Sequence, residues 1–302
     1  MPTLVSLDGR SVAPEAAVIS VFDRGFLYGD SVYEVIRAYR GVPFELTHHL
    51  DRLRGSAERI GMSLPVALET LADETRRAIQ ESGEPEAYVR VVVTRGAGAI
   101  GLDVALAEAP RRLVFVEPVS KKRPPAELYE HGAKLAIVGV VRNLREAVDP
   151  AAKTGNYLNS VLALAEAKRA GAHEALMLDH RGLVTEGASS NVFVVFGAML
   201  LTPPLDVGIL AGVTRHVVLE LAKDGGLRAL ELPLTRKVIL EADECFITST
   251  IREIVPVVEV DGMRVGEGKP GRSTRRLIEL FKGRVERQID ASVQDAAGAR
   301  GA

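Results

Sequence analysis

The sequence predicts a mixed fold of α-helices and β-strands, divided into two domains. Residues 31–39 and 87–94 alternate apolar and polar side chains, which is typical of strands with one buried face. Residues 47–60 instead repeat their apolar side chains at helical spacing. Residues 118–126 combine charge with three prolines, a composition that favours an exposed connection between domains over a core element.

The first domain, residues 1–117, is predicted to be a small α+β domain. It opens with a hairpin, because Asp8-Gly9 tolerates the positive φ angles of a tight turn. The remaining elements expected here are the strand at 31–39, a helix at 47–60 capped by Thr47, a helix at 66–81, and a strand at 87–94 paired with one at 113–117.

The second domain, residues 127–287, is predicted to intermingle short strands and helices. Strands are expected at 133–141, 175–178 and 191–196, helices at 157–170 and 214–223, and a hairpin at 255–265. Residues 288–302 are rich in alanine, glycine and aspartate and have almost no apolar period, so a frayed tail is expected there.

The charge, the cysteine content and the hydropathy of the sequence limit the expected binding partners and the expected cellular compartment. The 302 residues carry 38 Lys and Arg against 40 Asp and Glu, so no uniform basic field is available to hold nucleic acid or an anionic membrane. The single cysteine, Cys245, cannot form an internal disulfide and suits a reducing compartment. No run approaches the roughly 18 apolar residues that span a bilayer. We therefore expect a cytoplasmic protein with small-molecule partners.

One glycine motif favours a different class of protein. Gly96, Gly98 and Gly101 follow a strand and match the dinucleotide-binding pattern, which would indicate a nicotinamide-dependent oxidoreductase. That pattern requires a crossover helix, and only residues 102–109 are available before Pro110. A flexible loop is the favoured interpretation, and the oxidoreductase is kept as an alternative.

Lys153 is the first candidate for covalent chemistry. It lies in a stretch of small residues directly before the helix predicted at 157–170, and small neighbours allow a flat ring to approach. A deprotonated lysine amine attacks an aldehyde carbon and forms a Schiff base. Lys153 is therefore a candidate Schiff-base residue, with an ordinary surface lysine as the alternative.

Glu186 is the candidate partner of a pyridine ring. It lies on a glycine-containing turn, with Ser190 and Asn191 close behind it at the start of an apolar strand. A carboxylate that keeps a pyridine nitrogen protonated makes the ring a better electron sink. A hairpin carboxylate in water is the alternative interpretation.

Three further segments suit a phosphate. Gly212 and Thr214 begin the helix predicted at 214–223, whose free amides and dipole attract anions. Ser249 and Thr250 follow a strand and can donate hydroxyl hydrogen bonds. Arg52 projects from the helix at 47–60 and can bind phosphate with two donors. Helix capping, a threonine-rich loop and a solvated arginine explain the same residues without a ligand.

Taken in this order, the motifs resemble the class IV family of pyridoxal-phosphate enzymes, also called fold type IV. The family comprises D-amino-acid aminotransferases, branched-chain aminotransferases and aminodeoxychorismate lyases. The resemblance extends from about Leu4 to Lys282. It implies a larger C-terminal domain with a pseudo-barrel β core, a cofactor held between two domains, and a homodimer.

The resemblance also implies a role for each motif. Lys153 would form the Schiff base with pyridoxal 5'-phosphate and move the proton during the reaction, and Glu186 would contact the pyridine nitrogen. The other residues implied to bind the cofactor are Arg52, Val213, Thr214, Ser249 and Thr250 at the phosphate, Leu210 against the ring, and Tyr157, Ser190, Asn191 and Gly212 beside them.

Aromatic and basic residues of the N-terminal domain are candidates to line the substrate pocket. Alternation places Tyr33 and Arg37 on one face of their strand, and Tyr88 and Arg90 on one face of theirs, where they can meet a substrate carboxylate. Tyr28 completes this predicted set. The set favours amino acids with apolar or modest side chains, of either hand.

The motifs divide among three reactions within the family. Residues 189–191 and 248–250 are similar to D-amino-acid aminotransferases, and 88–90 to branched-chain aminotransferases. Residues 23–29 and 205–210 look like aminodeoxychorismate lyases, which eliminate pyruvate. We expect an aminotransferase that moves amino groups between amino acids and 2-oxo acids, with the lyase as the alternative.

Overall fold

The computed structural model describes residues 4–298, and the chain divides into two compact units. Unit 1 comprises Met1–Arg123, Ala152–Tyr157 and Val285–Ala302, and unit 2 comprises Pro124–Ala151 and Leu158–Arg284. This grouping differs from a division at residues 118–126, because two later segments join the first unit. Each unit is described by itself.

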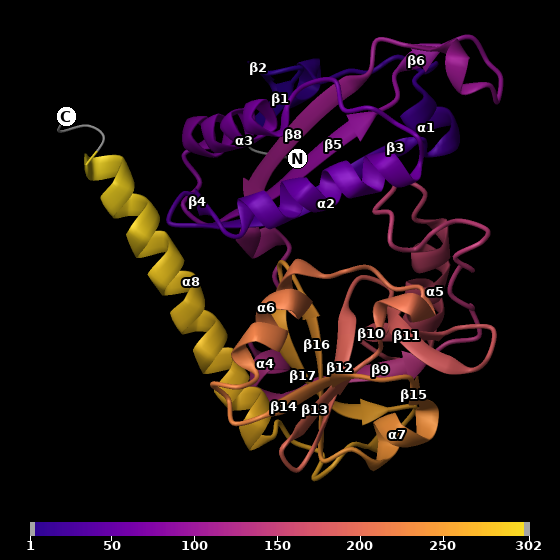
Figure 1. The fold of residues 1–302 in the computed structure, drawn as a ribbon, viewed down its shortest axis with the longest axis vertical. Helices are drawn as coiled ribbons and strands as arrows, with labels where there is room; N and C mark the ends of the chain where they lie inside the picture. Colours follow the sequence, from indigo (N-terminus) through magenta and orange to yellow (C-terminus); the bar gives the residue numbers. More distant parts are fainter. Residues whose placement is uncertain (1–3, 299–302) are drawn as a thin grey trace. The chain divides into compact units, whose positions relative to one another are not determined.

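Unit 1 is built on a six-stranded antiparallel sheet in the order β2-β1-β8-β5-β3-β4 (Figure 1). The predicted N-terminal hairpin, the two alternating strands and the later strand that pairs with the second of them are all confirmed. The strands are β1 (Leu4–Leu7), β2 (Arg10–Val12), β3 (Ser31–Tyr39), β4 (Val42–Pro43), β5 (Ala87–Thr94) and β8 (Arg111–Pro118).

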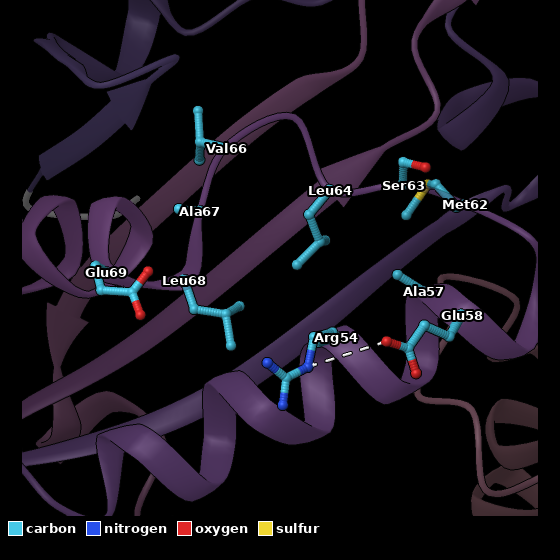
Figure 2. Close-up of a pocket in the computed structure, with 10 residues that line it drawn as sticks. All are labelled: Arg54, Ala57, Glu58, Met62, Ser63, Leu64, Val66, Ala67, Leu68 and Glu69. Carbon is cyan, nitrogen blue, oxygen red and sulfur yellow. Dashed lines mark ion pairs between the residues drawn. The ribbon is translucent and has the colours of Figure 1, made fainter.

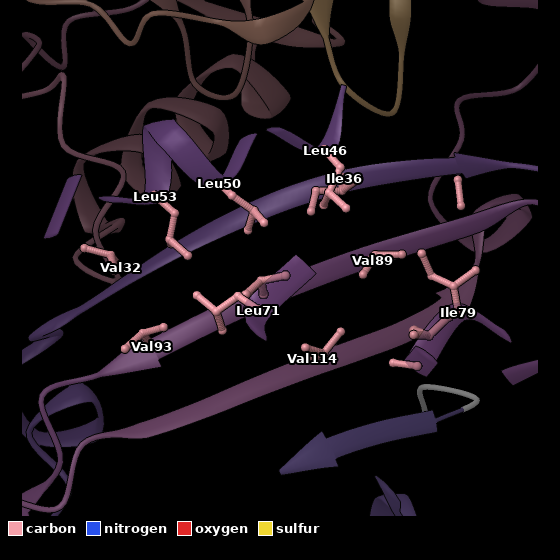
Figure 3. Close-up of a cluster of buried hydrophobic side chains, with 14 of the residues drawn as sticks. Val32, Ile36, Leu46, Leu50, Leu53, Leu71, Ile79, Val89, Val93 and Val114 are labelled. Carbon is pink, nitrogen blue, oxygen red and sulfur yellow. The ribbon is translucent and has the colours of Figure 1, made fainter. Parts of the chain in front are cut away.

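Two helices pack on this sheet, α2 (Leu46–Arg59) and α3 (Leu68–Ser82). Figure 3 shows Leu50 and Leu53 of α2 beside Leu71 of α3 and the strand residues they contact, and all belong to one buried cluster. Thr47 is not the N-cap of α2. Glu45 occupies that position with φ 52° and makes no side-chain cap hydrogen bond, so the N-cap lies two residues earlier than predicted.

The glycine motif lies in a short β-ribbon, with β6 (Ala97–Gly98) paired to β7 (Ala107–Glu108). A Cβ at Gly98 would lie 1.8 Å from the Leu106 carbonyl oxygen, so close backbone approach explains this glycine. Between the two strands the chain forms only the 3-10 turn η2 (Val104–Leu106). The dinucleotide-binding interpretation is therefore wrong, since no crossover helix follows the glycines.

The segment Ala152–Tyr157 joins unit 1 through backbone bonds to β3. Tyr33 N–H donates to the Lys153 carbonyl at 3.0 Å, and Gly155 N–H donates to the Ser31 carbonyl at 2.8 Å. Thr154 also forms an isolated bridge with Val32. Lys153 is thereby fixed beside the start of β3, which no linear division of the sequence indicates.

The last helix, α8 (Arg272–Gly298), is continuous through most of the predicted frayed tail. Ile289 is buried, and Arg40 of unit 1 forms an ion pair with Asp290, so this part of the chain is ordered by packing. Residues 299–302 lie outside the described part. None of the helices within residues 4–298 is long and apolar enough to cross a bilayer.

Unit 2 is built on a ten-stranded mixed sheet in the order β14-β13-β12-β16-β17-β9-β10-β11-β15, with β18 beside β17 (Figure 1). Strands β11 and β12 lie far apart in this order, yet only three residues join them and the two strands contact each other. The sheet must therefore curl, which is the predicted pseudo-barrel core.

The strands of unit 2 are β9 (Ala133–Ile137), β10 (Glu174–Leu178), β11 (Leu183–Gly187), β12 (Asn191–Phe196), β13 (Met199–Thr202), β14 (Arg228–Glu231), β15 (Leu234–Thr235), β16 (Glu244–Ser249), β17 (Glu253–Val260) and β18 (Met263–Arg264). The shorter helices are α1 (Arg24–Tyr28) in unit 1, and α4 (Glu127–His131), α5 (Leu158–Arg169), α6 (Val213–Leu221) and α7 (Arg236–Glu241) in unit 2.

Candidate active site

In unit 1, Lys153 is held at both sides of its peptide backbone. Its N–H donates to Ser56 Oγ of α2 at 3.0 Å, and its carbonyl accepts from Tyr33 of β3. The amine Nζ lies 3.4 Å from Tyr33 Oη and 5.5 Å from the centre of the Tyr157 ring. The structure thus brings together three of the predicted site residues.

Tyr33 is the centre of this group. Its ring meets Tyr157 edge to face at 5.7 Å, and the Arg90 guanidinium of β5 lies 4.0 Å from the ring centre. Burial raises the pKa of Tyr33, and the neighbouring Tyr157 adds to the effect. The phenol therefore stays neutral and can donate or accept a hydrogen bond beside the lysine amine.

Arg52 lies on α2 and pairs with Glu34, a fully buried carboxylate on β3. Arg52 Nε and Nη2 donate to the two Glu34 oxygens at 2.7 Å each, and His49 Nδ1 lies 2.8 Å from Glu34 Oε2. Burial alone would raise the pKa of Glu34, but Arg52 and His49 lower it to about 2. The carboxylate is therefore ionised at neutral pH.

The other predicted substrate residues of unit 1 have different partners. Arg37 pairs with Glu86 at 3.3 Å and stacks over Tyr39, while Tyr88 lies near Lys122. Tyr28 Oη accepts from Gly101 N–H, at the glycine-rich ribbon. Tyr33 therefore contacts Lys153 directly and Arg90 contacts Tyr33, while Arg37, Tyr88 and Tyr28 have the partners given above.

In unit 2, Glu186 is buried on β11 and is not a hairpin acid in water. Arg142 donates to its Oε1 from Nε at 3.0 Å and from Nη2 at 2.9 Å. Leu210 N–H and Asn191 Nδ2 donate to Oε2 at 3.1 and 3.4 Å. The structure thus brings Glu186, Asn191 and Leu210 together, and Arg142 balances the carboxylate charge.

Gly212 is the N-cap of α6, which begins with Val213 and Thr214. A Cβ at Gly212 would lie 2.0 Å from Asn191 Oδ1, so a larger residue here would displace the Asn191 side chain. The N-cap makes no side-chain cap hydrogen bond. The first amides of a nine-residue helix therefore lie beside Asn191, in a position that suits an anionic ligand.

The predicted hydroxyl groups lie at the end of β16 and in the loop after β11. Ser249 Oγ accepts from Arg252 Nε at 3.0 Å, and Arg252 pairs with the buried Glu174 at 2.7 Å. Glu174 also accepts from Ser190 Oγ at 3.4 Å. Thr248 Oγ1 is buried and has no hydrogen-bond partner among the described residues. Glu174 and Arg252 therefore link the segment of Ser190 to the segment of Ser249.

Several residues that organise these groups were not predicted. Glu34 had a signal, because it is the one charged side chain on the otherwise apolar face of its strand. His49 and Ser56 had a signal in their helical spacing from the predicted Arg52. Arg142, Glu174 and Arg252 had none, since their contacts join segments that are far apart in the chain.

Unit 1 also contains a pocket of about 430 Å³ between α2 and the start of α3 (Figure 2). Leu64 and Leu68 line it together with the charged residues Arg54, Glu58 and Glu69. None of the predicted site residues lines this pocket, so it plays no part in the candidate site.

The comparisons with known proteins agree with this fold. A family model described as amino-transferase class IV matches residues 31–260. The chain is 42% identical over 278 residues to a Methanocaldococcus jannaschii protein provisionally named a branched-chain-amino-acid aminotransferase, covering 92% of this chain and 95% of that protein. The chain therefore belongs to the class IV aminotransferase family.

Two further relatives differ in their named reactions. The D-alanine aminotransferase of Bacillus licheniformis is 34% identical over 273 residues, covering 90% of this chain and 94% of that protein. The solved structure of the T.th. branched-chain amino acid aminotransferase with pyridoxamine 5'-phosphate superimposes with a TM-score of 0.88 at 33% identity, covering 93% of each chain.

His49 should make the stability of the protein depend on pH. Burial lowers the pKa of His49 below 6.5, and Arg52 and Lys153 act in the same direction, against Glu34. Below pH 6.5 the unfolded chain then binds a proton that the folded chain does not, so stability falls as the pH falls. Urea unfolding followed by circular dichroism from pH 7.5 to 5.5 should show a loss for the wild type that His49→Gln reduces by up to about 1.4 kcal/mol per pH unit. Equal pH slopes in the two proteins would contradict this expectation.

Proposed function

We propose that this protein is a pyridoxal-phosphate-dependent aminotransferase that moves the amino group of an amino acid to a 2-oxo acid. The observation that carries the proposal is the placement of Lys153, with its backbone fixed at two points and its amine beside Tyr33 and Tyr157. Membership of the class IV aminotransferase family supports the same reaction.

The residues present fit the cofactor chemically. In unit 2, the amides that begin α6 and the hydroxyls of Thr248, Ser249 and Thr250 form a donor set suited to phosphate. The buried Thr248 Oγ1 lacks a partner among the described residues, which a phosphate oxygen would supply. In unit 1, Arg52 is a further phosphate donor.

Each residue then has a stated task. When bound, the cofactor supplies an aldehyde that takes up amino groups and a ring that withdraws electrons. Lys153 Nζ would hold the aldehyde carbon until the substrate amine takes its place, and the released lysine amine would then be the base that takes the proton from the α-carbon of the substrate. Glu186 holds the pyridine nitrogen, and Tyr33 orients the lysine amine. The remaining assignments are phosphate binding by Arg52, Val213, Thr214, Ser249 and Thr250, ring packing by Leu210, and supporting contacts by Tyr157, Ser190, Asn191 and Gly212.

The substrate pocket is proposed to include Arg90 and Tyr33, with Tyr28, Arg37 and Tyr88 as further members. Arg90 stacks on Tyr33, so its planar group is oriented on the same face of the sheet as the lysine. An arginine in this position suits the carboxylate that every amino acid and 2-oxo acid carries.

Lys153→Ala should abolish the visible absorbance band that distinguishes the lysine-bound cofactor from free pyridoxal phosphate. It should also reduce transamination by about 100-fold or more, because the same amine links the cofactor and moves the proton. The matched control is Lys223→Ala, which removes an exposed lysine of unit 2. Full turnover by Lys153→Ala would overturn the proposed role of this residue.

The substrate can be identified by half-reactions. D-alanine, D-glutamate, L-leucine and L-glutamate are added one at a time to the purified holoenzyme, and the visible spectrum is followed. Loss of the cofactor band with a D-amino acid, and its return with a 2-oxo acid, would indicate a D-amino-acid aminotransferase. Loss with L-leucine would indicate the branched-chain reaction. A band that none of the four changes would favour the aminodeoxychorismate lyase instead.

We also propose a homodimer in the cytoplasm. Large apolar side chains are exposed in both units, with Phe26 and Leu102 at 67% and 84% in unit 1 and Leu158 and Val161 at 62% and 55% on α5. Apolar surface of this kind is typical of an interface. Light scattering coupled to size-exclusion chromatography should give about twice the chain mass of 32.5 kDa. A mass of one chain at micromolar concentration would refute the dimer.

The cytoplasmic location is supported by the single, buried cysteine.

A further inference from the structure

One face of α2 carries a line of largely buried polar side chains, of which only Arg52 has a task in the proposed function. His49, Arg52 and Ser56 follow each other at spacings of three and four residues, so they project from the same side of the helix. The adjoining face of α2 carries Leu46, Leu50 and Leu53 into the hydrophobic core, as Figure 3 shows. The polar line therefore lies at the edge of the core.

Glu34 of β3 is the common partner of this line. It is 0% exposed, and it accepts from both Arg52 Nε and Arg52 Nη2 as well as lying 2.8 Å from His49 Nδ1. Two parallel bonds fix the plane of the guanidinium, not only its position. A guanidinium has five N–H donors, and Glu34 occupies two of them.

Stability alone is a poor reason for such a pair. Taking two charges out of water is costly, and a buried ion pair is often no more stabilising than apolar side chains of similar volume. A buried pair does, however, hold a charged side chain in one orientation. The Glu34–Arg52 pair is thus better explained by the orientation it imposes than by its contribution to folding.

The same line of residues reaches Lys153. Ser56 Oγ donates to the Arg52 carbonyl at 2.8 Å and accepts from Lys153 N–H at 3.0 Å. Tyr33, the residue before Glu34, binds the Lys153 carbonyl through its own N–H. Arg52 is therefore bound to Glu34 of β3, and Lys153 is bound to the adjacent Tyr33 of β3 and to Ser56 of α2, one turn after Arg52.

We propose that Glu34 is a positioning residue that orients Arg52 toward the phosphate group of the cofactor, with His49 holding the Glu34 carboxylate in place. The inference rests on the proposed function, in which Arg52 binds that phosphate. It predicts that Glu34 affects the affinity for a phosphate monoester and leaves the affinity for the same ring without phosphate nearly unchanged.

The test measures binding and not activity. The full-length chain, freed of cofactor, is titrated calorimetrically with 4'-deoxypyridoxine 5'-phosphate and with 4'-deoxypyridoxine. Neither has an aldehyde, so neither can bond covalently to Lys153. The ratio of the two affinities reports the contribution of the phosphate group. Circular dichroism confirms that each variant is folded.

Glu34→Gln should lower this ratio by about tenfold, because the amide of glutamine opposes one of the two guanidinium donors and Arg52 must rotate. Glu34→Asp keeps the negative charge but moves it away from Arg52 by one methylene. Because this variant keeps the ion pair, a smaller reduction in the ratio is expected. The double variant Glu34→Gln/Arg52→Gln should have the same ratio as Arg52→Gln alone, because Glu34 acts through Arg52.

The matched control is Glu74→Gln, because Glu74 is also a buried carboxylate of unit 1 in a bond pair with an arginine, Arg112. It should leave the ratio unchanged. Equal loss of affinity for both ligands in Glu34→Gln would show a merely structural role and overturn the inference, as would an unchanged ratio in both Glu34 variants. If Arg52→Gln itself leaves the ratio unchanged, the assignment of Arg52 to the phosphate fails, which is a failure of the proposed function and not of Glu34 alone.

Discussion

Two hydrogen bonds to the peptide groups of Lys153 determine where the reactive amine of this protein lies. One bond comes from β3 and the other goes to α2, elements that lie more than 90 residues away in the chain. Because the backbone is held on both sides, the side chain has a fixed origin and projects beside Tyr33 and Tyr157. The core of unit 1, which packs α2 on β3, is thus also the support of the lysine.

Buried carboxylates paired with arginines recur at the predicted site residues. Glu34 binds Arg52, Glu186 binds Arg142, and Glu174 binds Arg252. A buried charge without a partner would cost far more than the pair does, so each acid requires its arginine. Each pair also holds the planar guanidinium of its arginine in one orientation, which an apolar core cannot do. The chain thereby holds several polar groups in place before any ligand binds.

The local elements could be predicted because their causes are local. Alternation gave β3 and β5 with their bounds, and the Asp8-Gly9 turn gave the first hairpin. The start of α2 after Glu45 and the extension of α8 to Gly298 could not, because a cap without a side-chain bond and a polar helix are both stabilised by packing. The order of Lys153, Glu186 and Thr214 indicated the family, which the comparison over residues 31–260 establishes.

The sequence by itself determined the class of protein, the strand that carries Tyr33 and Glu34, and the residue types available for each task. Only the tertiary structure decided which of them meet. It returns the segment Ala152–Tyr157 to the first unit, pairs Glu34 with Arg52 and His49, and pairs Arg37 with Glu86. The reason is physical: alternation and helical spacing act over a few residues, whereas these contacts join elements that only folding brings together.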